Sequence, residues 1–428
     1  MSLPEQTPEQ RAGQTAERAK ARSVAALAST PENTEVLEWF RRQRAWINDQ
    51  HAALCRIPAP TFFEQKRAEW MKEQFTLLGW PAEIDRAGNV VAMREEHRQF
   101  ANGPVVAVTA HLDTVLAPRT ADDIRMLGEG RLSGPGVSDN GAGLTALLAL
   151  AAAWPKEDGH LAAIPMLVAN VGEEGEGNLS GIRYLCRPGN NIDFRAFLVL
   201  DGPGVDHVTY RALASRRFEI VMNGTGGHSW RDSENCNAVH ALSRAVTLFT
   251  DAFHARKCRF EEDGIRAAVN FGIIEGGSSI NSIPAEARAK LDLRSENPAV
   301  MDELAALLAQ SVEEAAAIEN ARKSGAPVNA KLREIGSRPG GEIARDAPLL
   351  ASLRAVDQFL GIRSRLDCSS TDANIPLSLG LPAVSIGVGG QGGGAHTAGE
   401  WYGPVGRELG LRRVFLTLSM LLRGELSR

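Results

Sequence analysis

The chain lacks the features that mark membrane, disulfide-stabilised or nucleic-acid-binding proteins. Its most apolar run, residues 144–154, stops at Pro155, far short of the roughly 20 residues that a membrane-spanning helix needs. Its five cysteines are scattered and form no CxxC pair, which predicts free thiols in a reducing compartment rather than a disulfide framework. A formal net charge of -5 gives no basic footprint, so no nucleic-acid partner is expected. The N-terminal segment has no apolar core, so we expect no signal peptide and a cytoplasmic location.

The rest of the composition is that of an ordinary globular protein, with 43% apolar and 23% charged residues. A length of 428 residues exceeds what one hydrophobic core usually holds, so two domains are expected. Residues 1–33 read as a polar tail that Pro31 closes, and a helix pattern opens the first domain at residue 34. Apolar strand-like segments then alternate with helical stretches, a pattern typical of a mostly parallel sheet with helices on both faces.

The pattern changes after Asp201. Strands are predicted at 217–222, 267–274, 287–294 and 330–335, and helices at 238–253 and 299–322. Their order, β-α-β-β-α-β, is the ferredoxin-like arrangement. The sequence therefore predicts a second, smaller α+β unit.

One segment indicates metal chemistry. His111 and Asp113 follow the apolar strand pattern of residues 105–110. Side chains alternate along an extended chain, so His111 and Asp113 emerge on the same side, where the carboxylate can orient the imidazole. A histidine held by an acid is ready to bind a metal ion.

Four further segments place acids or a histidine at turns. Asp139 precedes an Ala/Leu-rich helical stretch, Glu173 and Glu174 follow the apolar run 164–171, Asp201 follows 197–200, and His396 lies beyond 382–386 and several glycines. Each alone is typical of a turn or helix cap. Functional groups of α/β proteins gather beyond the carboxyl ends of strands, so the recurrence favours a shared site. Two histidines and three acids suit two zinc ions about 3.5–4 Å apart with a bridging carboxylate, which leaves one Glu for proton transfer.

This ordered series, with the Gly-x-x-x-His that ends at His228, resembles the co-catalytic two-zinc exopeptidases and deacylases. That family includes tripeptide aminopeptidase, carnosine-type dipeptidases, glutamate carboxypeptidases, acetylornithine deacetylase and succinyl-diaminopimelate desuccinylase. The resemblance runs from about residue 36 to the C-terminus. It implies a catalytic domain of the zinc-exopeptidase type at residues 34–208 and 338–428, and an inserted lid and dimerisation domain at 209–337 through which the chain forms a homodimer.

The resemblance also implies roles for the metal-site residues. His111 and Asp201 would bind one divalent ion and Glu174 and His396 the other, with Asp139 bridging both. The ions would be zinc first, with manganese or cobalt as alternatives. Glu173 would be the general base, and Asp113 would orient His111. Many family members have a Lys after the bridging segment, where this chain reads Asp139-Asn140-Gly141-Ala142-Gly143, a difference that concerns substrate handling rather than the metals.

The inserted domain adds three candidates. The resemblance implies that His228 steadies the oxyanion, often from the partner subunit; the alternative is a turn residue after glycines. Asn281 and Arg294 resemble the positions that hold the substrate's carboxylate, a task that suits the planar fork of Arg. The alternative for Arg294 is a surface residue at a strand end.

Two other sequence patterns match known motifs only superficially, because the segments around them do not fit those motifs. Residues 387–392 fit GxGxxG, but no helix pattern or later βαβ unit follows, so a loop that delivers His396 is expected instead of a dinucleotide site. Residues 369–372 match no nucleophile elbow and predict a turn near the substrate.

The function predicted first is hydrolysis of a short peptide by a two-zinc aminopeptidase or dipeptidase. Asp at position 201 favours this branch, because deacylases of the family more often have Glu there. The alternative is an N-acyl-amino-acid amidohydrolase on the same scaffold. A non-catalytic peptide-binding relative is a third reading, which the intact acid cluster disfavours.

Overall fold

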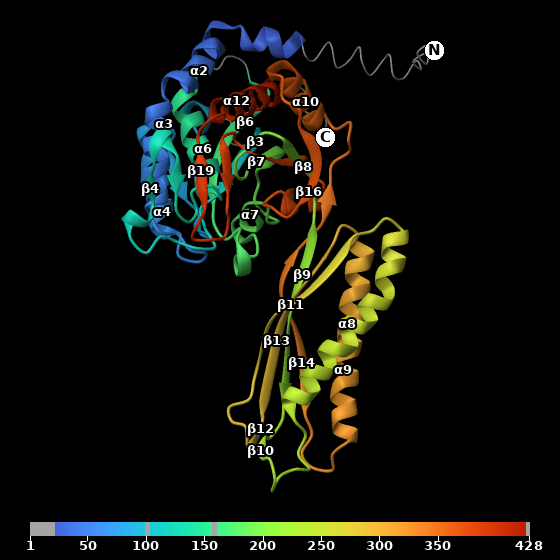
Figure 1. Ribbon diagram of the computed structural model, residues 1–428. Coiled ribbons are helices and arrows are strands. Elements are labelled where there is room, and N and C mark those ends of the chain that lie inside the picture. The colour runs from blue at the N-terminus through green and yellow to red at the C-terminus, as the bar shows by residue number, and fades with distance from the viewer. Residues whose placement is uncertain (1–21, 99–102, 156–160, 425–428) are drawn as a thin grey trace, which may run out of the picture. The chain divides into compact units, whose positions relative to one another are not determined.

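The computed structural model describes residues 22–98, 103–155 and 161–424 (Figure 1). The chain divides into two compact units, Met1–Arg211 with Gly341–Arg428 (unit 1) and Ala212–Gly340 (unit 2). Most of the predicted N-terminal tail, residues 1–21, lies outside the described residues. Helix α2 (Pro31–Arg42) begins at Pro31 and not at residue 34 as expected, because Thr30 caps it by accepting a hydrogen bond from Asn33 N at 3.3 Å. Proline suits this first helical turn, where its missing N–H has no partner to lose.

Unit 1 is built on a nine-stranded sheet whose central four strands are parallel. In sheet order the main strands are β1 (Ala82–Ile84), β2 (Val90–Ala92), β6 (Ile164–Asn170), β3 (Pro104–His111), β7 (Asp193–Leu200), β17 (Ala383–Ile386), β8 (His207–Ala212) and β15 (Gly341–Glu342), and β16 (Arg365–Ser369) pairs with β8. The neighbours β6, β3, β7 and β17 pair in parallel. Every residue of β6 is buried, which is why this strand reads as an apolar run without alternation.

The helices of unit 1 pack around this sheet. They include α2, α3 (Arg44–Cys55), α4 (Gln65–Leu77), α5 (Glu95–Arg98), α6 (Gly141–Ala153), α7 (Ser180–Leu185), α10 (Pro348–Leu360), α11 (Asn374–Ser378) and α12 (Arg407–Arg423), with 3-10 turns at Ala121–Asp123, Gly128–Gly130 and Gly175–Gly177. Helix α6 holds the most apolar run and contacts β3, β6, β7 and four helices (α2, α3, α4 and α12), so it is a core helix. Within the part of the chain that the structure describes, no helix is long and apolar enough to cross a membrane.

A small antiparallel sheet joins two distant parts of unit 1. Its order is β18 (Gln391–Gly393), β19 (Trp401–Gly403), β5 (Leu132–Ser133) and β4 (Arg125–Met126). The pairing of Trp401 with Ser133 brings the chain that follows His396 against the chain that leads to Asp139. The GxGxxG segment leads into β18, a strand, and not into a helix.

Unit 2 has the predicted β-α-β-β-α-β order. Its elements are β9 (Ala214–Asn223), α8 (Ala238–Glu262), β11 (Ala267–Gly276), β13 (Glu286–Ser295), α9 (Pro298–Ala321) and β14 (Asn329–Arg338), with two-residue strands β10 (Gly227–His228) and β12 (Ser282–Ile283). The strands pair antiparallel in the order β11-β13-β9-β14, and α8 and α9 lie side by side on the sheet (Figure 1). Burial alternates along β13, because only the helix-covered face is closed. The predicted fold class, a mostly parallel α/β sheet with an inserted α+β domain, is confirmed.

Candidate metal centre

The carboxyl ends of three neighbouring parallel strands supply most of the candidate side chains. His111 is the last residue of β3, Glu173 and Glu174 follow β6, and Asp201 follows β7. Asp139 lies just before α6, whose first turn is capped by Asn140. Parallel strands end at one edge of a sheet, so the topology brings these side chains together.

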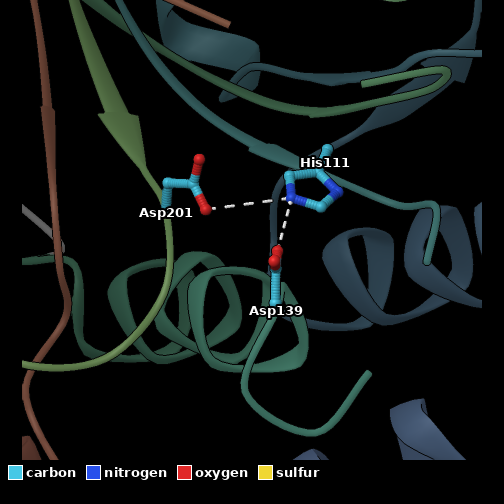
Figure 2. A group of neighbouring side chains, drawn as sticks. All are labelled: His111, Asp139 and Asp201. Atoms are coloured by element: carbon cyan, nitrogen blue, oxygen red, sulfur yellow. Dashed lines mark hydrogen bonds and ion pairs between the residues drawn. The ribbon is translucent and has the colours of Figure 1, made fainter. Parts of the chain in front are cut away.

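Asp139 lies at the centre of the cluster, with its two carboxylate oxygens turned toward different histidines. Its Oδ1 is 3.0 Å from His111 Nε2, and its Oδ2 is 3.1 Å from His396 Nε2. A further carboxylate approaches each imidazole: Asp201 Oδ1 lies 3.8 Å from His111 Nε2, and Glu174 Oε1 lies 3.0 Å from His396 Nε2. Figure 2 shows the His111 ring facing both Asp139 and Asp201.

These contacts define two overlapping groups of ligand atoms. In each, the atoms lie within 4.8 Å of one another, and the two groups are His111, Asp139 and Asp201, and Asp139, Glu174 and His396. Each offers one imidazole nitrogen and two carboxylates, a donor set that fits zinc and similar divalent ions. A third group of the same span combines His111 with Glu173 and Glu174. The residues present therefore fit two cations that share Asp139.

The electrostatics of the cluster favour a positive charge. Burial alone would lower the pKa of His111, but the nearby carboxylates of Asp113, Asp139 and Asp201 raise that pKa well above the ordinary value. The hydrogen bond to Asp139 raises the pKa of His396 to about 9. Burial would raise the pKa of Asp139, but the two histidines hold it below the ordinary value. The carboxylates thus stabilise positive charge at this site: without metal ions, that charge is carried by protons on the two imidazoles.

Asp113 contacts the glutamate pair as well as His111. Its carboxylate accepts hydrogen bonds from the main-chain N–H groups of Glu173 at 2.9 Å and Glu174 at 2.8 Å, and from the Thr61 hydroxyl at 3.0 Å. His111 Nδ1 lies 3.6 Å from that carboxylate and only 2.9 Å from the main-chain oxygen of Asp113. The Asp113 side chain therefore positions the turn that carries both glutamates, a contact that the sequence analysis did not foresee.

Two other side chains that bind main-chain groups near the cluster were not predicted from the sequence. The Asn140 side chain donates to Leu200 O at 2.8 Å and accepts from Gly143 N at 3.0 Å, so it ties the start of α6 to the end of β7. The buried Glu400 accepts hydrogen bonds from the loop that leads to Asp139. Side chains that bind main-chain groups far away in sequence leave no periodic pattern, so only the adjacency of Asn140 to Asp139 could have indicated one of them.

The acidic side chain of the turn at residues 369–372, that of Asp372, is buried. Asp372 is 1% exposed and accepts a hydrogen bond from Asn170 Nδ2 at 2.6 Å. Burial raises the pKa of Asp372 to about 7. Asp372 therefore packs against the end of β6. The sequence predicted a turn near the substrate, but the burial of Asp372 does not support a direct contact between this side chain and a substrate.

The three remaining candidates belong to unit 2, where two of them lie together. His228 on β10 pairs with Ser282 on β12, and Ser229 N donates to Asn281 O at 3.0 Å. Arg294 lies near the other end of β13, where it pairs with Ser215 of β9 and its Nε donates to Asp292 Oδ2 at 2.6 Å. Asn281 precedes β13, which begins at Glu286. Strands rise about 3.4 Å per residue, so most of the length of β13 separates Arg294 from the segment that contains Asn281. Their roles toward the substrate remain predictions.

Comparison with known sequences identifies a domain in one part of the chain. Residues 214–320 match a family model described as a peptidase dimerisation domain. The cytosol non-specific dipeptidase of Escherichia coli (strain K12) is 27% identical over 293 residues, which cover 60% of this chain and 55% of that protein. The chain thus spans little more than half the length of this curated relative.

Comparison with solved structures extends over most of the chain. A tripeptidase from Staphylococcus aureus has a TM-score of 0.68 at 20% identity, over 88% of this chain and 97% of that one. A Bacillus subtilis protein described as a dinuclear metal binding peptidase from the M20 family has a TM-score of 0.59 at 14% identity, over 89% and 99% of the two chains. The matched domain and the shared fold confirm the resemblance that the motifs indicated.

Proposed function

We propose that this chain, which carries a peptidase dimerisation domain and has the fold of the M20 peptidases, is a two-metal exopeptidase that hydrolyses short peptides. One observation carries the proposal. The two oxygens of Asp139 turn to His111 and to His396, and each imidazole has a second carboxylate beside it. That arrangement suits two cations joined by one bridging carboxylate.

In the proposed site His111 and Asp201 would hold one ion, Glu174 and His396 would hold the other, and Asp139 would bind both. Bound there, two divalent ions, zinc first with manganese or cobalt as alternatives, would polarise the scissile carbonyl and activate water at neutral pH. The negative charges of the carboxylates would balance most of the positive charge of the two ions. Asn140 and Asp113 keep the ligand-bearing turns in place, so little reorganisation accompanies binding.

Glu173 is the proposed general base. Its side chain is buried and lies within the group formed with His111 and Glu174, whereas the carboxylate beside His396 is that of Glu174. The Asp113 carboxylate fixes the main chain of Glu173. From this position Glu173 would take a proton from the attacking water and deliver it to the leaving amine.

A second candidate function keeps the same metals and changes the substrate to an N-acyl amino acid. The curated dipeptidase and the tripeptidase structure support the peptide, as does Asp at position 201. A non-catalytic peptide binder would have no use for a buried cluster of carboxylates, which repel one another without a cation. The dipeptidase relative is a cytosol protein, and all five cysteines are free thiols, which supports a cytoplasmic location.

A homodimer through unit 2 is part of the proposal. The dimerisation-domain match covers 214–320, and β11 is an edge strand that exposes Ile273 and Ile274. An edge strand with exposed apolar side chains is a surface that pairs readily with another chain. Because Asn281 and Arg294 lie toward opposite ends of β13, we propose that one substrate carboxylate meets both only if they come from different copies.

The proposed function is tested by a steady-state assay on dipeptides, tripeptides and N-acetyl amino acids, with zinc, manganese or cobalt added to metal-stripped protein. We expect metal-dependent turnover of at least one short peptide. Turnover of the N-acetyl amino acids alone would favour the amidohydrolase. Metal binding without turnover of any substrate class would favour a non-catalytic binder.

His228→Ala is expected to lower kcat by roughly 10²–10³, the usual effect of removing one donor to an oxyanion. The N–H groups of Trp230 and Arg231 donate to His228 Nδ1 at 3.2 and 3.4 Å, which places the proton of the neutral ring on Nε2, ready to donate. Metal content should stay unchanged. His254→Ala, which removes another exposed histidine of unit 2, is the matched control.

Subunit mixing decides which copy supplies this donor. If His228 acts on the partner's site, mixing His228→Ala chains with Glu173→Ala chains should restore activity, because one site of each heterodimer is intact. Once subunit exchange is demonstrated, absence of rescue would show that the donor acts within its own chain. Full activity of His228→Ala alone would refute the role.

A further inference from the structure

Glu400 is a buried acid that none of the proposed roles uses. It follows His396 in the loop before β19 and is 2% exposed. Its Oε1 accepts hydrogen bonds from Ser138 N at 2.6 Å and Asp139 N at 2.8 Å, and its Oε2 accepts one from Gly136 N at 2.7 Å. One carboxylate therefore binds three main-chain N–H groups of the turn that ends at Asp139.

The main chain of Glu400 contacts the same turn. Gly134 N donates to Glu400 O at 2.8 Å, and Trp401 pairs with Ser133 across β19 and β5. Gly136 has a φ of 75°, and a Cβ there would lie 2.4 Å from Thr114 Cγ2, so the turn is closely packed. The three N–H groups point inward from a turn that is neither helix nor strand, and the Glu400 carboxylate satisfies them.

We propose that Glu400 is a positioning residue for the bridging carboxylate of Asp139. The inference rests on the proposed two-metal function. A bridging ligand must present each oxygen to a different ion, so a small shift of its main chain weakens both positions together. Glu400 binds the N–H of Asp139 itself and belongs to the same loop as His396, so it couples the bridge to a ligand of one ion. Groups behind metal ligands set ligand orientation in this way.

The Glu400→Gln variant separates this role from simple packing. An amide keeps the shape of the carboxylate but has one acceptor oxygen, and its NH₂ group would face an N–H donor of the turn. Asp85→Asn is a matched control. Asp85 Oδ1 accepts hydrogen bonds from the N–H groups of Ala87, Gly88 and Asn89 at 2.8, 3.0 and 3.1 Å, and its Oδ2 accepts one from Asn89 Nδ2 at 2.8 Å, so an amide here would also turn its NH₂ group toward a donor. This turn lies between β1 and β2 and carries none of the proposed ligands.

The experiment measures metal affinity by chelator competition with Zn²⁺ and Co²⁺, together with hydrogen–deuterium exchange of residues 134–139 in metal-free protein. For E400Q we expect metal affinity to fall by roughly 10–100-fold and the turn to exchange faster, while D85N binds metal like wild type. If E400Q does not fold, E400D, which keeps the charge on a shorter side chain, should show the same direction of change.

Two outcomes would contradict the inference. A folded E400Q with wild-type metal affinity would refute the positioning role. An equal loss of affinity in D85N would show that any broken turn has this effect. Wild-type protein that binds no metal ion would instead overturn the proposed function on which the inference rests, so the two failures are distinguishable.

Discussion

Asp139→Ala is expected to remove both metal ions and to abolish hydrolysis. The two oxygens of this carboxylate face the two histidines, so the substitution takes a ligand from each proposed ion at once. Replacing even a group behind a metal ligand costs about 10–100-fold in affinity, so losing the shared ligand should lower the affinity at both positions by more than that. Elemental analysis of gel-filtered protein, combined with the peptide assay, measures both effects.

The matched comparison is His396→Ala, which takes a ligand from one proposed ion only. We expect that variant to keep more metal than Asp139→Ala. Both variants should gain less thermal stability from added zinc than wild type does, because a ligand stabilises the folded state only as far as it binds. Two retained ions per chain in Asp139→Ala would show that this residue does not bridge.

Glu173→Gln is expected to keep both ions and still lose activity by roughly 10²–10⁴ in kcat, the contribution typical of a general base. Glutamine preserves the shape of the buried side chain but cannot accept the proton of the attacking water. The adjacent substitution Glu174→Gln should behave differently, because Glu174 Oε1 lies 3.0 Å from His396 Nε2 and is the proposed ligand. That variant should lose metal as well as activity.

Comparing the two variants by elemental analysis and steady-state kinetics assigns the roles of the pair. An active Glu173→Gln that holds two ions would remove Glu173 from the chemistry. If Glu173→Gln loses metal while Glu174→Gln retains it, the two roles are exchanged, an arrangement compatible with the third group of His111, Glu173 and Glu174.

Local patterns in the sequence predicted much of the fold. The apolar runs of β3 and β6 indicated strands of a mostly parallel sheet, and the order of strands and helices after Asp201 indicated the α+β unit. These patterns work because burial and side-chain periodicity act over a few residues. The start of α2 was missed because it depends on the Thr30 cap and on a proline in the first helical turn, which the sequence analysis took for the end of a tail.

For the site, the sequence by itself determined which residue types stand beyond the ends of β3, β6 and β7, and parallel pairing then requires those ends to meet. Only the tertiary structure decided how the atoms face one another. It turned the two oxygens of Asp139 to different histidines, and it set the Asp113 carboxylate against the N–H groups of Glu173 and Glu174. It also brought Glu400 to the turn before Asp139. Such contacts join residues far apart along the chain and depend on loop conformation, so no short-range periodicity encodes them.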